Sequence, residues 1–159
     1  LTHVDLVSDE QLAAMRRDIQ RANPRVPLLE SIHKPDVLLE VKTEIKHRCD
    51  HLKNRPIATL AGLASPQQFE TCLERSGVPI AQRWRYPDHH RYTRAELASI
   101  DRLRAGLPLV TTFKDIVKFP ADWRGVLGGE VYALGIKLEI IKGKNIWSDA
   151  LLDLTEPKA

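Results

Sequence analysis

Hydrophobic positions near the start of the chain follow a helical period and then lose it. Ser8 and Gln11, a pair typical of a capping box, precede apolar residues spaced three and four apart, which predicts a helix. The apolar segment before them, 1–6, predicts a short strand. Two prolines interrupt the pattern after the helix, and the β-branched and leucine-rich run 37–41 predicts either a strand or an extended linker.

From residue 55 onward, apolar runs alternate with helical patterns. Pro66 directly follows Ser65, the predicted N-cap, and Gly77 ends the segment, which is typical of a helix that has a proline in its first turn. Thr93 and Glu96 form a second capping-box pair. The predicted elements are strands at 56–64, 78–86, 107–112 and 131–141, helices at 66–76 and 94–104, a short helical turn at 114–119 and a terminal amphipathic segment containing Leu151, Leu152 and Leu154.

This alternation predicts an α/β fold with a mainly parallel central sheet and helices on both faces, because parallel neighbours need crossover connections. Ligands of such sheets gather at the carboxyl ends of the strands. Three loops follow predicted strands, at 62–65, 88–92 and 111–115. We expect these loops to open at one edge of the sheet.

The composition is that of a folded protein. The 159 residues, 43% of them hydrophobic and 28% charged, suit a single α/β domain over 1–159. Within it, 1–54 is a weaker strand–helix and linker region, and 55–159 carries the sharper signals. No apolar run approaches the roughly 18 residues that cross a bilayer. The chain opens on Leu1, with neither an initiator Met nor a signal sequence, so we expect a fragment of a longer protein.

Net charge and cysteine usage exclude few classes of binding partner. The net charge of +3 fits phosphate-bearing or anionic ligands and does not indicate nucleic acid. Cys49 and Cys72 lack paired spacing, which is typical of reduced thiols in a cytoplasmic protein.

The most reactive residues in the loops are Asp88, His89 and His90. A carboxylate beside an imidazole can orient its tautomer and raise its basicity, which general-base catalysis needs. The alternative is that Asp88 caps the turn and that both histidines are exposed loop residues.

A second group, Thr111, Thr112, Lys114 and Asp115, places hydroxyls and an ammonium where a strand ends. Such groups can hold phosphate or sugar oxygens. The alternative is helix capping, with Thr112 as the N-cap, Asp115 in the first turn and Lys114 in solvent.

Three other patterns indicate little new chemistry. His47, Cys49 and His51 cannot all face one way on a regular element and have no second ligand pair, so a metal site is not predicted. The basic aromatic stretch 83–86 fits a half-buried strand better than a nucleic-acid surface. The sequence has no Walker A motif, so it offers no recognisable cradle for nucleotide phosphates.

Four ordered blocks carry a resemblance to a known family. They are LTHVDLVS at 1–8, ATLAGLASPQQFETCLERSGV at 58–78, YPDHHRYT at 86–93 and LVTTFKDIVKF at 109–119. Their order and spacing resemble the second half of tetraacyldisaccharide 4'-kinases, and the resemblance covers nearly the whole chain.

Individual positions match the family's motifs with some departures. Its Asp-His-His turn matches residues 88–90, and its small-residue loop before a proline-started helix matches 61–69. Its Thr-Thr-Glu-Lys-Asp turn matches 111–115, except that Phe113 replaces the glutamate. The chain also has Gly-Leu-Ala at 62–64 where the family usually has Gly-Ile-Gly or a similar sequence, and Leu-Thr-His-Val-Asp at the start where the family has Leu-Thr-Arg-Ala-Asp.

The resemblance implies a kinase that uses ATP and magnesium to phosphorylate the 4'-hydroxyl of a lipid A disaccharide 1-phosphate. It places the enzyme in the cytoplasm at the inner face of the bacterial inner membrane, with peripheral membrane contact and no nucleic-acid partner. ATP and magnesium would be bound mainly by an N-terminal P-loop half that this chain lacks, so the chain alone is expected to be inactive.

The resemblance also implies roles for individual residues. His89, supported by Asp88, would orient or relay a proton from an aspartate of the N-terminal half, although the residues alone do not separate His89 from His90. Substrate contacts would come from His90, Thr111, Thr112, Lys114 and Asp115. The alternative is a noncatalytic binding module that uses the same loops to hold an anionic carbohydrate or lipid headgroup.

Overall fold

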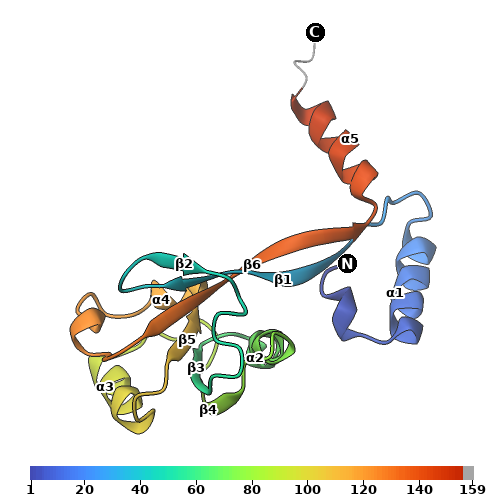
Figure 1. The fold of residues 1–159 in the computed structure, drawn as a ribbon. Coiled ribbons are helices and arrows are strands. Elements are labelled where there is room, and N and C mark those ends of the chain that lie inside the picture. Colours follow the sequence, from blue (N-terminus) through green and yellow to red (C-terminus); the bar gives the residue numbers. More distant parts are fainter. Residues whose placement is uncertain (156–159) are drawn as a thin grey trace. The chain divides into compact units, whose positions relative to one another are not determined.

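The computed structural model describes residues 1–155, with side chains up to Leu152, and divides into two compact units (Figure 1). The terminal unit contains residues 1–34 and the chain from Lys137, and the central unit contains residues 35–136. The strands β1 (Glu30–Glu40) and β6 (Val131–Lys142) contribute residues to both units. The run 37–41, predicted as strand or linker, falls largely within β1 and is therefore mostly strand.

The terminal unit opens with a short 3-10 helix, η1 (Val4–Leu6), so the strand predicted at 1–6 is wrong. His3 takes a left-handed conformation with φ of 56°, and the Leu6 N–H donates to the His3 carbonyl, which turns the chain instead of extending it. The helices α1 (Asp9–Ala22) and α5 (Lys144–Thr155) complete the unit, and the capping box predicted for α1 is confirmed.

The central unit contains the alternating elements that the hydrophobic pattern predicts. They are β3 (Ile57–Ala61), α2 (Pro66–Arg75), β4 (Ile80–Arg85), α3 (Arg94–Leu103), β5 (Leu109–Thr112) and α4 (Phe113–Ile116). The capping box of Thr93 and Glu96 is present at α3. Two short elements were not predicted: β2 (Ile45–His47) and the 3-10 helix η2 (Trp123–Gly125).

The strands form one six-stranded sheet in the order β2-β1-β6-β5-β3-β4. The pairs β3–β4, β3–β5 and β5–β6 are parallel, whereas β1–β2 is antiparallel. This confirms the predicted α/β fold with a mainly parallel sheet. All five residues of β3 are buried, as expected for a central strand covered on both faces.

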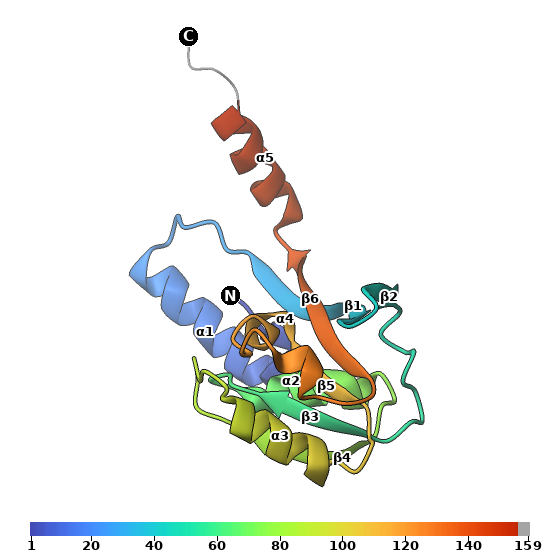
Figure 2. The same cartoon turned by 90° about the vertical axis from the view of Figure 1, so that its left-hand side faces the viewer.

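Helices cover both faces of this sheet, as predicted. Leu97 and Ile100 of α3 pack in one hydrophobic cluster, and Phe69 and Leu73 of α2 pack in the other. Figure 1 shows α2 and α3 on opposite sides of β3, and Figure 2, turned by 90°, shows α3 in front of that strand.

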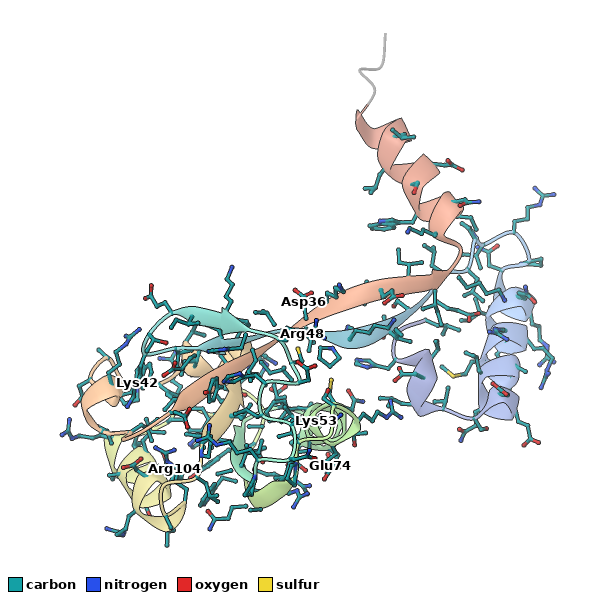
Figure 3. The ribbon with its side chains drawn as sticks, in the orientation of Figure 1. Asp36, Lys42, Arg48, Lys53, Glu74 and Arg104 are labelled. Carbon is teal, nitrogen blue, oxygen red and sulfur yellow. The ribbon has the colours of Figure 1, made fainter. Side chains whose placement is uncertain are left out.

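A buried arginine holds the far end of α3 to the strands. Arg104, labelled in Figure 3, is 1% exposed and forms an ion pair of 2.6 Å with Asp101. Its guanidinium also donates to the backbone carbonyls of Leu107, Gly128 and Glu130. The arginine therefore provides hydrogen-bond donors to backbone carbonyls of the loop that leads from α3 into β5 and of the turn before β6.

Candidate functional site

The three predicted loops come together at one edge of the sheet. Because β4 and β5 each pair in parallel with β3, the carboxyl ends of these strands share that edge. Lys114 Nζ lies 3.2 Å from Asp88 Oδ1 and joins the second loop to the third. Lys118 Nζ lies 3.4 Å from the Gly62 carbonyl oxygen and joins the third to the first. The structure therefore brings the loops into a single candidate site.

Gly62 lies at the most crowded point between these loops. A Cβ at this position would lie 2.9 Å from Tyr92 Oη, 3.2 Å from Asp115 Oδ1 and 3.3 Å from the Pro87 carbonyl oxygen. Real side chains do not tolerate the shortest of these contacts. Glycine at the end of β3 thus permits the other two loops to approach.

The turn after β4 presents His89 to solvent. His89 has a φ of 62°, a left-handed conformation that histidine adopts more often than most residues, and its side chain is 76% exposed. Its backbone N–H donates to Asp88 Oδ1 over 3.0 Å, and its Nε2 lies 3.5 Å from Asp88 Oδ2. The hydrogen bond from Lys114 is the main cause that lowers the pKa of Asp88, so this group stays a carboxylate at neutral pH.

His90 is held quite differently from His89. Its ring stacks on Tyr86 with centroids 4.4 Å apart and meets Tyr92 edge-on at 5.0 Å. Its Nε2 lies 3.2 Å from Glu96 Oε1, on the side chain that caps α3. His90 is therefore a half-buried packing residue, which distinguishes two histidines that the sequence alone did not separate.

The predicted threonine and aspartate group lies mostly inside the protein. Thr112 caps α4, accepting from the Asp115 N–H over 3.1 Å and donating to Asp115 Oδ2 over 2.8 Å. Asp115 is fully buried and pairs with Lys118 Nζ at 3.0 Å. Thr111 is also fully buried, and within residues 1–155 its hydroxyl has no hydrogen-bond partner. Of the group, Lys114 is the side chain that solvent reaches freely.

Two residues of the site, Tyr92 and Lys118, were not singled out from the sequence. Tyr92 is 4% exposed, and burial followed by the Asp115 charge raises the pKa of its hydroxyl. Both residues lie inside the sequence blocks that carry the family resemblance, so their position in those blocks was the available signal.

Potential metal ligands are dispersed in the part of the chain that the structure describes. Within residues 1–155, no group of three or more His, Cys, Asp or Glu side chains is placed to hold a metal ion. The rings of His47 and His51 stack on each other with centroids 3.9 Å apart. None of the helices in this range has the length and apolar character needed to span a bilayer.

The fold and the gathered polar loops define an α/β protein with a candidate ligand site at the carboxyl edge of its parallel strands. The sequence profile of the family described as LpxK, tetraacyldisaccharide-1-P 4'-kinase, matches residues 1–156. The chain belongs to this family.

Individual relatives agree with the family profile. The tetraacyldisaccharide 4'-kinase of Elusimicrobium minutum (strain Pei191) is 35% identical over 154 residues, which cover 95% of this chain and 41% of that protein. The enzyme of the same name from Anaeromyxobacter sp. (strain K) is 34% identical over 154 residues, covering 95% of this chain and 40% of that protein. The chain thus spans about 40% of the length of these curated relatives.

A solved structure shares the fold. The crystal structure of "apo" form LpxK from Aquifex aeolicus in complex with ATP matches with a TM-score of 0.51 and 22% sequence identity. The match covers 96% of this chain and 50% of that one. At this level of identity the likeness supports the architecture and not the roles of individual residues.

Proposed function

We propose that this chain forms the acceptor-sugar side of an active site that transfers the γ-phosphate of ATP to the 4'-hydroxyl of a tetraacyldisaccharide 1-phosphate. The observation that carries the proposal is the Asp88–Lys114 ion pair beside the exposed His89, at an edge where three loops converge. A base, a carboxylate beside it and a cation can each assist phosphoryl transfer to a hydroxyl, by moving a proton and by neutralising charge around the acceptor.

His89 is the group of this set that is placed to handle a proton. The 4'-hydroxyl loses its proton as the phosphoryl group arrives, and His89 orients the aspartate of the N-terminal half that accepts this proton or relays the proton from it. Asp88, whose pKa is lowered by Lys114, stays ionised and stabilises the positive charge that His89 gains. Lys114 has a side chain 51% exposed and can donate to oxygens of the acceptor sugar.

The sequence and the described residues of this chain offer no recognisable ATP or magnesium site. The sequence lacks a Walker A loop, and residues 1–155 offer no cluster of metal ligands. We therefore assign ATP and magnesium to an N-terminal P-loop half, with residues 1–159 as the C-terminal part of the kinase.

The cellular site follows from the proposed substrate. A tetraacylated disaccharide is held in a membrane by its acyl chains, so the kinase must work at a bilayer surface. We place it in the cytoplasm, where ATP is available, in peripheral contact with the inner face of the bacterial inner membrane.

Transfer of radiolabel from γ-labelled ATP to the acylated disaccharide tests the proposal. The chain alone should show no transfer and should bind ATP-magnesium only weakly in calorimetry, whereas the chain joined to a P-loop half should phosphorylate the 4'-hydroxyl. Micromolar binding of ATP by the chain alone would contradict the assignment of the nucleotide. Binding of the disaccharide without any transfer by the joined protein would support a noncatalytic binding module instead.

A further inference from the structure

The central unit has a groove that the proposed chemistry does not use. Its volume is about 460 Å³, within the range of small-molecule sites. The apolar side chains in it include Leu39 and Ile116, which pack against the same core cluster as α3. The residues that line the groove are Leu39, Val41, Glu44, Lys46, Phe113, Ile116, Trp123 and Arg124.

Phe113 gives the groove an aromatic wall that is partly open to solvent. Phe113 is 40% exposed, although its ring lies close to the backbone of β6. A Cβ added to Gly135 would lie 2.7 Å from Phe113 Cε2, so the ring rests directly over that glycine. An exposed ring held this closely remains available to an apolar ligand.

The rim of the groove is positively charged. The Arg124 guanidinium lies 4.9 Å from the centroid of the Trp123 ring and donates to the Val41 carbonyl over 3.3 Å, which fixes its position. Lys46 is exposed, and its ammonium forms no hydrogen bond or ion pair with the other described residues. The charged residues that line the groove are thus two cations and one carboxylate, that of Glu44, and this net positive charge favours an anion.

We propose that this groove holds one acyl chain of the acidic glycolipid, with a phosphate of the same molecule at Lys46 and Arg124. The identity of the occupant rests on the proposed function. An acylated sugar phosphate combines an apolar chain with an anion, which complements a groove that combines an apolar wall with two cations. The groove also shares α4 with the candidate site: Lys114 of this helix pairs with Asp88, while Phe113 and Ile116 line the groove. One short helix thus contacts both the acceptor sugar and an acyl chain.

The test uses the 159-residue chain and dodecyl phosphate, a single-chain anion, at concentrations below micelle formation. Replacing Trp84 and Trp147 with Phe leaves Trp123, at the groove, as the sole indole emitter. Because Trp123 is already buried, we expect a saturable change in the intensity of its emission. Octyl phosphate, which is four methylenes shorter, should bind about tenfold to 250-fold more weakly, because each methylene withdrawn from water contributes up to roughly fourfold in affinity.

Three variants identify the groove as the binding site. Phe113→Glu should weaken binding about tenfold or more, since it removes apolar contact and adds a like charge. Lys46→Gln and Arg124→Gln should each weaken it about two- to fivefold and reduce its dependence on salt. Arg102→Gln, which removes an equally exposed cation from α3, should change nothing. Lys46 is exposed, so its variant tests the groove even if Phe113→Glu were to unfold the chain.

Several results would overturn the proposal. They are the absence of a saturable Trp123 response, equal binding of uncharged dodecyl maltoside, unchanged affinity in Lys46→Gln and Arg124→Gln, or a response only with anionic phospholipid vesicles, which would make the groove a membrane contact. None of these titrations needs ATP or turnover. Their failure would leave the proposed kinase function untouched, and a kinase assay that failed would leave the binding result standing.

Discussion

Lys114 Nζ lies 3.2 Å from Asp88 Oδ1, and the two residues are 26 positions apart in the sequence. This ion pair connects the turn after β4 with the helix after β5. The same carboxylate oxygen accepts the backbone N–H of His89. The position of the exposed histidine therefore depends on a cation supplied by a different loop.

Replacing Lys114 with Met should raise the pKa of Asp88 toward its ordinary value near 3.9, because the hydrogen bond from Lys114 is the main cause that lowers it. A group with a lowered folded-state pKa stabilises the fold above its unfolded pKa, and this contribution is lost as the pH falls through the folded pKa. The difference in unfolding free energy between wild type and variant should thus be present at pH 6 and should shrink as the pH falls below the unfolded-state pKa toward the folded-state pKa.

Carbon-detected NMR titration of the Asp88 carboxyl measures this shift directly. Arg102→Met is the matched control, because it removes an exposed cation from α3 and should leave the Asp88 titration unchanged. An Asp88 pKa that is the same with and without Lys114 would show that the ion pair does not persist in solution.

Replacing Arg104 with Met should destabilise the chain by about 3–5 kcal/mol, because it leaves buried carbonyls without their donor and the Asp101 carboxylate without its cation. Urea denaturation monitored by circular dichroism gives the change in unfolding free energy. Arg102→Met, two residues earlier on the exposed side of the same segment, should stay within about 0.5 kcal/mol of wild type. Equal effects of the two variants would contradict the role assigned to the buried guanidinium.

Replacing Gly135 with Ala should cost about 1–3 kcal/mol, because the new Cβ would lie 2.7 Å from Phe113 Cε2 and 2.8 Å from Val37 Cγ1. Combining it with Phe113→Ala should recover part of that cost, so the two changes should be less than additive. Gly125→Ala is the control, since a Cβ there meets nothing within 4 Å. Thermal melts of Gly135→Ala, Phe113→Ala, the double variant and Gly125→Ala test the prediction, and strict additivity would show that the ring does not rest on Gly135.

The parts of the fold that the sequence predicted depend on short-range interactions. The capping boxes at Ser8 and Thr93 are formed by side chains three residues apart, and both occur as predicted. The strand expected at 1–6 does not form because His3 adopts a left-handed backbone conformation, which the hydrophobic pattern does not indicate. The Leu1 amino group donates to the Leu29 carbonyl, a contact across 28 positions that no local pattern could indicate.

The candidate site was predictable in outline because parallel strands bring their carboxyl ends to one edge. Which residues of the site are buried and which reach solvent was not predictable from the sequence. Thr111 and Asp115 were assigned to the substrate together with Lys114, yet both are fully buried while Lys114 faces solvent. The burial of β5 and the interaction of Asp115 with Lys118 decide this difference, and both are consequences of tertiary packing.

Two changes at His89 separate its chemical role from its structural one. Replacing it with Gly should leave the unfolding free energy unchanged or raise it by up to about 1 kcal/mol, because glycine adopts a φ of 62° without the cost of a Cβ. Replacing it with Ala retains that cost and also removes the imidazole. A stability series in urea should therefore rank the Gly variant at or above wild type, with the Ala variant near wild type.

In the kinase that contains this chain, both His89 variants should lower kcat much more than they raise the KM of either substrate. A group that orients or relays a proton acts mainly in the transition state, and general-base catalysis contributes about 100- to 10,000-fold. Because His89 is a supporting partner, its replacement should lower kcat by about 100-fold or less. His90→Ala should be milder in kcat but should lower stability, because it removes the stacking on Tyr86. Asp88→Ala should act through the looser turn. If folded His89→Ala turned over at a near-normal rate, the catalytic role would be wrong, and the turn would be one of capping residues and solvated histidine.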